Sequence, residues 1–256
     1  MEMITNMGFS LQKNKNSSSM NNSISMQSKF GEIHAKIEQK LKENYSGIVK
    51  INFSAGELGD LKVCEDIHNA FNAEIMADNL FIKCDGGEKE IIHRKLANSF
   101  ENQNQNWWTS SNTICTVKNN QYRPDVSVWF QSPTRPQRRM PIIYPCPPPN
   151  VWIEIFYNND KDHSYAFSKI KFLQQNTNGI EFVAISLPSG LDSFHSKPET
   201  EMIVHATNQL IQPTKAPYVC HWDLNHNKIW YKMDWNQFIT LICGLTISFD
   251  IVLKEL

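Results

Sequence analysis

Two carboxylates stand out because each lies in a short apolar stretch of strand-like composition. Asp125 lies in RPDVSVWF and Glu154 lies in VWIEIF, where valine, isoleucine and aromatic residues surround the acid. Removing a carboxylate from water is costly unless a partner or a metal ion compensates for the lost hydration. Two such acids on consecutive strands therefore indicate a shared cation. The alternative is that either acid lies at the end of its strand, in contact with water.

A hard divalent cation fits this pattern of ligands. Mg²⁺ is held in proteins through one or two carboxylates, with carbonyl oxygens, water and substrate phosphate completing its shell. Asp125, Glu154 and the backbone carbonyl of Ile155 would supply the protein ligands for Mg²⁺ or Mn²⁺. This prediction requires both side chains to point to the same face of the sheet.

The elements that must position these acids alternate between strand-like and helix-like patterns. Strands are predicted at 47–53, 79–84, 113–117, 123–130, 151–156 and 181–187, and helices at 88–102 and 164–176. The stretches YVCHWDL and KIWYKMDW near the end of the chain predict a β-hairpin. This order predicts a mixed α/β fold, with a central sheet flanked by helices and a C-terminal hairpin extension.

The N-terminal part of the chain differs in composition from the rest. Residues 1–27 are rich in Asn, Ser, Met and Lys without an apolar period, which is typical of a disordered tail. From Ser28 the apolar residues recur at helical spacing, so an amphipathic helix is predicted over 28–45. Residues 46–256 are predicted to form one domain.

Composition limits the classes of partner and compartment. The net charge of −1 gives no overall attraction to nucleic acid, so an anionic partner needs a local patch or a metal ion. The six cysteines form no CxxC pair, which disfavours a zinc ribbon. The N-terminus lacks the apolar core of a secretory signal, and FITLICGLTISF is shorter than the roughly 20 residues that span a bilayer. We therefore expect an intracellular protein, cytoplasmic or nuclear, without a membrane partner.

RPDVSVWF followed by PNVWIEIF, a lysine-bearing helix and a further strand resembles the Uma-type restriction endonucleases of the PD-(D/E)xK superfamily. The resemblance covers roughly residues 72–187, and is weaker in the C-terminal hairpin. It implies a restriction-endonuclease-like core in which Pro124 and Asp125 form the proline-aspartate pair and Glu154 is the second acid. It also implies a metal-dependent nuclease that hydrolyses phosphodiester bonds, with DNA as the first expected substrate.

The chain departs from the general motif at one position. Phe156 stands two residues after the glutamate, where the motif has lysine. In the family that this chain resembles, the following helix carries the lysine instead. Lys169 lies nearer than Lys171 to the apolar stripe of the helix predicted over 164–176, so we expect Lys169 to be the catalytic lysine. The alternative is that both lysines are solvated on the helix surface.

The resemblance also implies an acid or a histidine at the start of the helix before the strands. Glu88 best fits this place and is expected as a further metal ligand, while Glu90 points farther from the apolar stripe. An acid in the first helical turn also complements the helix dipole without any further role.

Further residues are candidates for contact with nucleic acid. Arg135, Arg138 and Arg139 lie in a proline-rich connection predicted as a loop, where they either contact phosphates or stay on a solvated surface. Trp107 and Trp108 either stack on bases or fill a core.

Two interpretations of the function remain open from sequence. In the first, Asp125 and Glu154 bind the metal ion that activates water, and Lys169 orients that water or stabilises the developing charge. In the second, the chain is a catalytically inactive module that binds nucleic acid or a protein partner. The displaced lysine and the near-neutral charge favour the second. A homodimer, the strandedness of the substrate and the choice of DNA or RNA also stay open.

Overall fold

A computed structural model describes residues 17–44, 47–54, 56–84, 87–157, 162–187, 203–204, 210–211, 217–234 and 236–253. Its centre is a six-stranded sheet with the strand order β13-β12-β9-β8-β7-β4. The bounds are β4 (Trp108–Ser111), β7 (Val126–Trp129), β8 (Val151–Tyr157), β9 (Glu181–Leu187), β12 (Tyr218–Trp222) and β13 (Lys228–Lys232). β8 and β9 are parallel and the other neighbours are antiparallel, so the sheet is mixed.

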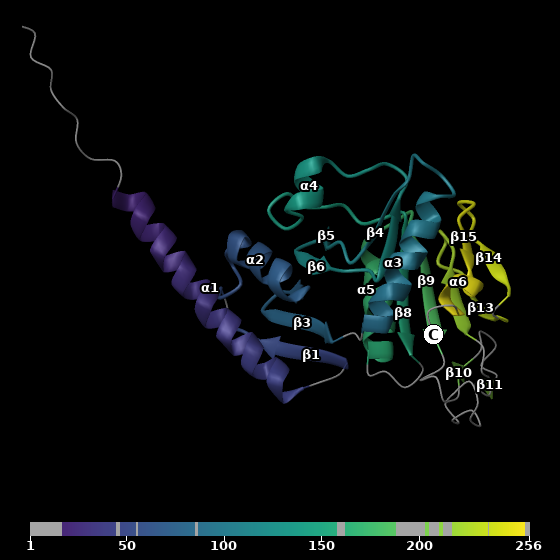
Figure 1. The fold of residues 1–256 in the computed structure, drawn as a ribbon, viewed down its shortest axis with the longest axis horizontal. Helices are drawn as coiled ribbons and strands as arrows, with labels where there is room; N and C mark the ends of the chain where they lie inside the picture. The colour runs from purple at the N-terminus through teal and green to yellow at the C-terminus, as the bar shows by residue number, and fades with distance from the viewer. Residues whose placement is uncertain are drawn as a thin grey trace, which may run out of the picture.

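Helices cover both faces of this central sheet (Figure 1). On one face, α3 (Gly87–Glu101) packs with α6 (Phe249–Leu253) and the hairpin of β14 (Phe238–Thr240) and β15 (Thr246–Ser248). On the other face lies α5 (Asp162–Asn176), which provides the crossover that parallel strands β8 and β9 require. The predicted apolar stripe of α5 is buried against the sheet, as Ala166, Ile170 and Leu173 show.

A second, five-stranded sheet lies beside the central one, with the order β1-β3-β2-β6-β5 (Figure 1). Its strands are β1 (Gly47–Asn52), β2 (Glu74–Met76), β3 (Asn79–Cys84), β5 (Cys115–Val117) and β6 (Asn120–Tyr122). α1 (Ser17–Glu43) and α2 (Leu61–Phe71) pack with it around a separate hydrophobic core. Two short strands, β10 (Ile203–Val204) and β11 (Leu210–Ile211), pair with each other.

The fold class expected from the sequence is confirmed. The protein is mixed α/β, and the predicted hairpin forms as β12 and β13, which extend the central sheet beyond β9. Three strands of this sheet, β1, β3 and β5, lie within stretches predicted as strands. β2 and β6, which complete the sheet, were not predicted, because each spans three residues and is too short to show an alternating pattern.

The N-terminal helix differs from the prediction in two ways. α1 begins at Ser17 instead of Ser28, and a helix, once formed, extends by one hydrogen bond per added residue. Residues 1–16 of the predicted tail lie outside the described residues. In addition, the helix is part of the folded body, since Ile33 and Ile37 are buried in the core of the second sheet.

Other features can be compared directly with the sequence. The proline-rich connection, predicted as a loop, contains the short helix α4 (Arg135–Arg139), which begins with a capping box between Thr134 and Gln137. All six cysteines are free thiols. Among the residues described, no helix is long and apolar enough to cross a membrane.

A buried histidine in α2 makes the stability of the fold depend on pH. His68 is 8 % exposed, and its burial, together with the charge of Arg123, lowers its pKa from 6.5 to about 4. Below pH 6.5 the unfolded chain binds a proton at His68 and the folded protein does not. The contribution of neutral His68 to the free energy of unfolding is therefore fully present above pH 6.5. Between pH 6.5 and 4 we expect a loss of up to about 3 kcal/mol from this group.

Urea unfolding at several pH values tests this expectation. His68→Gln should flatten the fall in unfolding free energy between pH 6.5 and 4, because the group that takes up the proton is removed. His34→Gln, at a half-buried position on α1, is the matched control and should follow the wild type. If the unfolding free energy of His68→Gln falls between pH 6.5 and 4 as much as that of the wild type, groups other than His68 cause the loss.

Candidate active site

The two predicted acids meet between β7 and β8. Val126 pairs with Ile153 in the antiparallel register, so Asp125, directly before β7, lies across from Glu154 in β8. Nζ of Lys83 lies 2.6 Å from Oδ1 of Asp125 and 2.8 Å from Oε2 of Glu154. Because one nitrogen contacts both oxygens, the two carboxylates face the same point and are close enough to share one cation.

Asp125 is held in place by the backbone of the neighbouring strand. The Ile155 N–H donates a hydrogen bond of 2.7 Å to Oδ2 of Asp125. Nε2 of His93, from α3, lies 3.9 Å from the same oxygen. Ile155 was expected to contribute its carbonyl to a metal ion, and the contact that the structure places at the site is its amide.

Glu154 is fixed through its other oxygen. The indole N–H of Trp152, two residues earlier on the same face of β8, donates to Oε1 of Glu154 at 2.7 Å. Nζ of Lys169 lies 2.6 Å from this oxygen. Lys169 is 3 % exposed, whereas Lys171 is on the exposed surface of α5. The structure thus brings Lys169, and not Lys171, to the acids, while its catalytic role stays a prediction.

A third acid, from the second sheet, completes the surroundings of Lys169. Nζ of Lys169 donates to Oε1 of Glu74 at 2.9 Å and to the carbonyl of Arg123 at 3.0 Å. The Arg123 N–H donates to the same Glu74 oxygen at 2.6 Å, and the Tyr165 hydroxyl donates to the other Glu74 oxygen. Three oxygens therefore surround the Lys169 ammonium, which has three hydrogens to donate.

The environment moves the pKa values of the two predicted acids in opposite directions. Burial tends to raise the pKa of Asp125, but the charges of Lys83 and His93 outweigh it and hold this pKa below its usual range. Burial raises the pKa of Glu154, which Lys169 opposes and the nearby Asp125 reinforces. Carboxylates whose pKa values are driven apart are typical of acid and base pairs in enzymes.

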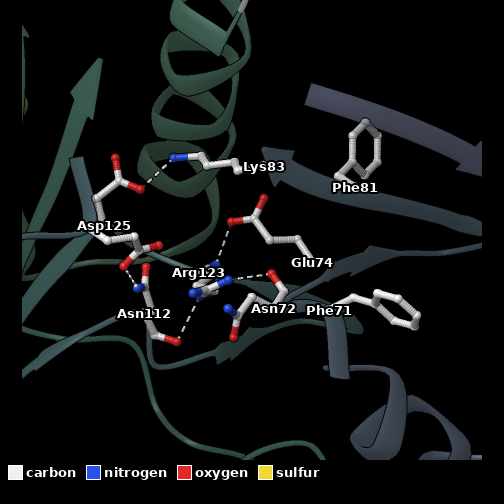
Figure 2. A pocket seen from close by; sticks show the side chains of 9 residues that line it. Phe71, Asn72, Glu74, Phe81, Lys83, Asn112, Arg123 and Asp125 are labelled. Atoms are coloured by element: carbon white, nitrogen blue, oxygen red, sulfur yellow. Dashed lines mark hydrogen bonds and ion pairs between the residues drawn. The ribbon is translucent and has the colours of Figure 1, made fainter. Parts of the chain in front are cut away.

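A cavity opens beside Asp125 and Lys83, at the junction of the two sheets (Figure 2). Its polar wall also includes Arg123, which donates to the Asn112 carbonyl at 2.9 Å and to the Asn72 carbonyl at 2.5 Å. The Lys83 side chain is 13 % exposed, compared with 3 % for Asp125 and 0 % for Glu154. Of these three groups, the lysine is therefore the one most open to the cavity.

Glu88, the acid expected at the start of the helix before the strands, does not lie beside the cavity. Glu88 is exposed in the first turn of α3 and is not part of the cavity wall. Glu90 lines the cavity instead, accepts a hydrogen bond of 2.7 Å from Asn112, and lies 3.9 Å from Nδ1 of His93. Residues two apart on a helix point about 200° away from each other, so Glu88 and Glu90 cannot both face Asp125.

The arginines and tryptophans proposed to contact nucleic acid lie away from the acids in the described contacts. The guanidinium of Arg138 in α4 lies 5.8 Å from the ring of Trp108. Trp108 packs against Trp129, with ring centroids 4.6 Å apart, and Trp107 packs against Phe130 at 5.5 Å. Both tryptophans thus make intramolecular ring contacts, as the core alternative requires.

The residues at the site fit a divalent cation whose coordination shell is completed by ligands from outside the protein. Among the described residues, no group of three or more His, Cys, Asp and Glu side chains is arranged to hold a metal ion. The available donors are two carboxylate oxygens, Oδ1 of Asp125 and Oε2 of Glu154, which are hard ligands of the kind that Mg²⁺ and Mn²⁺ prefer. Water and substrate phosphate would have to complete the coordination.

Comparison with known proteins gives a limited result. No protein-family model matches the chain, and no curated protein sequence matches it. Among solved structures, the chain is similar to a protein from Anabaena variabilis described as a "putative nuclease belonging to DUF820". The sequences are 13% identical, the TM-score is 0.47, and the match covers 72% of this chain and 90% of that one. A likeness at this level carries no functional assignment to this chain.

The two lysines of α5 provide a test of the buried charge network. Lys169→Met leaves Glu74 and Glu154 without the ammonium between them, so we expect a loss of about 3–5 kcal/mol in unfolding free energy. Lys171→Met, on the same helix but exposed, should change it by less than about 0.5 kcal/mol. Urea unfolding followed by circular dichroism measures both, and equal effects would contradict the structural role of Lys169.

Proposed function

We propose that the protein is a metal-dependent nuclease that hydrolyses phosphodiester bonds in nucleic acid, with DNA as the first candidate substrate. Asp125 and Glu154 would be the ligands of Mg²⁺ or Mn²⁺. The observation that carries this proposal is that two buried carboxylates from neighbouring strands both contact one cation, the ammonium of Lys83. Burying two like charges side by side is unfavourable unless a cation lies between them.

The residues around the acids have distinct parts in this proposal. A bound divalent cation would polarise the phosphate and lower the pKa of a bound water. Ile155 and Trp152 hold the two carboxylates in fixed orientations through their N–H groups. Such preorganised groups need not rearrange during the reaction, which is the main electrostatic advantage of an enzyme site.

Lys169 is better suited to positioning than to contact with the reacting water. Its side chain is fully buried and its ammonium is surrounded by oxygens of Glu74, Glu154 and Arg123. To bind a water molecule, it would have to give up one of these partners. We therefore assign Lys169 the task of holding Glu154, in place of the water-orienting task that the sequence suggested.

A second candidate function is a catalytically inactive module that binds nucleic acid or a protein partner. The observation in its favour is that Lys83 already compensates both acids. In this case the network would be purely structural, and no metal ion would be needed at the site.

Nuclease assays with matched variants test the proposal. Asp125→Asn and Glu154→Gln should each lower Mg²⁺-dependent or Mn²⁺-dependent cleavage of plasmid DNA by at least about 100-fold, because each removes one metal ligand. Glu101→Gln, at an exposed acid near the end of α3, should retain the wild-type rate. Circular dichroism spectra of all variants establish that the fold is intact.

Two outcomes would count against this assignment. Cleavage by Asp125→Asn at the wild-type rate would remove Asp125 from the site. Wild-type protein that binds DNA or RNA without cleaving it under any divalent cation tested would favour the inactive module. Because a metal site of this kind can act on any phosphodiester, single-stranded and double-stranded DNA and RNA are all included in the assay.

A further inference from the structure

We propose that Lys83 is an exchangeable counter-ion: its ammonium occupies the place of the divalent cation, and leaves it for the substrate phosphate when the cation binds. The binding of the metal ion and the binding of nucleic acid would then favour each other. The second half of this inference rests on the proposed nuclease function. The first half, the competition between Lys83 and a divalent cation, stands on the geometry alone.

The key observation is which carboxylate oxygens Lys83 contacts. Oδ2 of Asp125 already accepts the Ile155 N–H, and Oε1 of Glu154 already accepts the Trp152 N–H and contacts Lys169. The remaining oxygen of each acid, Oδ1 and Oε2, is the one bound by Lys83. These are the two oxygens that a shared metal ion would use, so the ammonium and the cation compete for the same atoms.

The Lys83 ammonium and a divalent metal ion cannot both lie between the two carboxylates. The ammonium lies 2.6 Å and 2.8 Å from the two oxygens, and Mg²⁺ would approach the same oxygens to about 2.1 Å. A divalent ion and an ammonium so close to each other would repel strongly in a buried site, where the effective dielectric constant is low. Metal binding must therefore displace Lys83, and the cost of that displacement weakens the apparent affinity for the metal.

The surroundings of Lys83 allow this movement. Lys83 lines the cavity from β3, in the second sheet, and its long side chain reaches across to Asp125 (Figure 2) and also contacts Glu154. Lysine is a flexible point charge, able to change partners within reach of its stem. A phosphate in the cavity would offer the displaced ammonium a new anionic partner, near the guanidinium of Arg123. Lys169 is less able to move, because it is only 3 % exposed and holds Glu74 as well as Glu154.

The direct test measures metal binding without any nucleic acid. We expect Lys83→Met to bind Mn²⁺ at least about tenfold more tightly than the wild type, because the competing ammonium is gone. Titration calorimetry and the electron paramagnetic resonance of free Mn²⁺ both give this affinity. Unchanged or weaker Mn²⁺ binding by Lys83→Met would overturn the exchange.

Thermal unfolding gives a second measurement that does not depend on a well-folded apo variant. Without Lys83, two buried acids lose their counter-ion, so Lys83→Met should be less stable than the wild type in chelator. Added Mn²⁺ should restore its melting temperature, and should change that of the wild type much less. If Lys83→Met is unfolded in chelator, Mn²⁺ should induce folding. Failure of Mn²⁺ to stabilise the variant would also overturn the exchange.

Two controls locate the effect at the acids. Lys50→Met, at an exposed lysine of the adjacent strand β1, should bind Mn²⁺ like the wild type. The double variant Lys83→Met/Asp125→Asn restores the balance of charge but removes one ligand, and should lose the gain in Mn²⁺ affinity. Tight binding that persists in the double variant would place the metal ion elsewhere and count against the exchange.

A final arm tests the coupling to nucleic acid and separates the two proposals. A short DNA duplex with phosphorothioate linkages, which resist cleavage, should tighten Mn²⁺ binding to the wild type and have little effect on Lys83→Met. A gain in Mn²⁺ affinity in Lys83→Met, with no cleavage by the wild type, would support exchange but refute the nuclease. Asp125-dependent cleavage without that gain would support the nuclease but refute exchange.

Discussion

The structure depends on a balance of charge at the junction of its two sheets. The carboxylates of Glu74, Asp125 and Glu154 and the ammonium of Lys169 are buried there, and the ammonium of the partly exposed Lys83 contacts Asp125 and Glu154. In an apolar interior, each of these charges would be costly without the others. The surrounding strands and helices bring these five charged side chains, which come from different elements, into contact with one another.

The network also explains why the two acids differ although both are buried. Asp125 is near Lys83 and His93, which keep it ionised, and Glu154 lies between its two lysines in a more enclosed place. A pair of this kind presents a strongly anionic group next to one whose charge is more easily neutralised. That difference arises from the neighbours of each acid, since Asp125, directly before β7, lies across from Glu154 in β8.

Sequence reasoning found the parts of the site that local patterns encode. The two acids were recognisable because each interrupts an apolar stretch. The family resemblance pointed to a lysine on the next helix, and Lys169 was preferred to Lys171 because it lies nearer the apolar stripe. Lys83 and Glu74 were missed because no local pattern connects them with the acids. Lys83 is 42 residues from Asp125 and 71 from Glu154, and the strand that carries Glu74 spans only three residues.

The sequence favoured Glu88 over Glu90, but Glu90 lines the cavity. Apolar spacing fixes the buried face of α3, but not which of its other faces meets the cavity.

The joining of the two sheets by ion pairs has a consequence for assembly. A chain with only one sheet formed would leave some of these charges in water, and a chain with the sheets packed out of register would bury them uncompensated. Partly docked states are therefore penalised, which favours cooperative folding of both sheets as one unit despite their separate apolar cores.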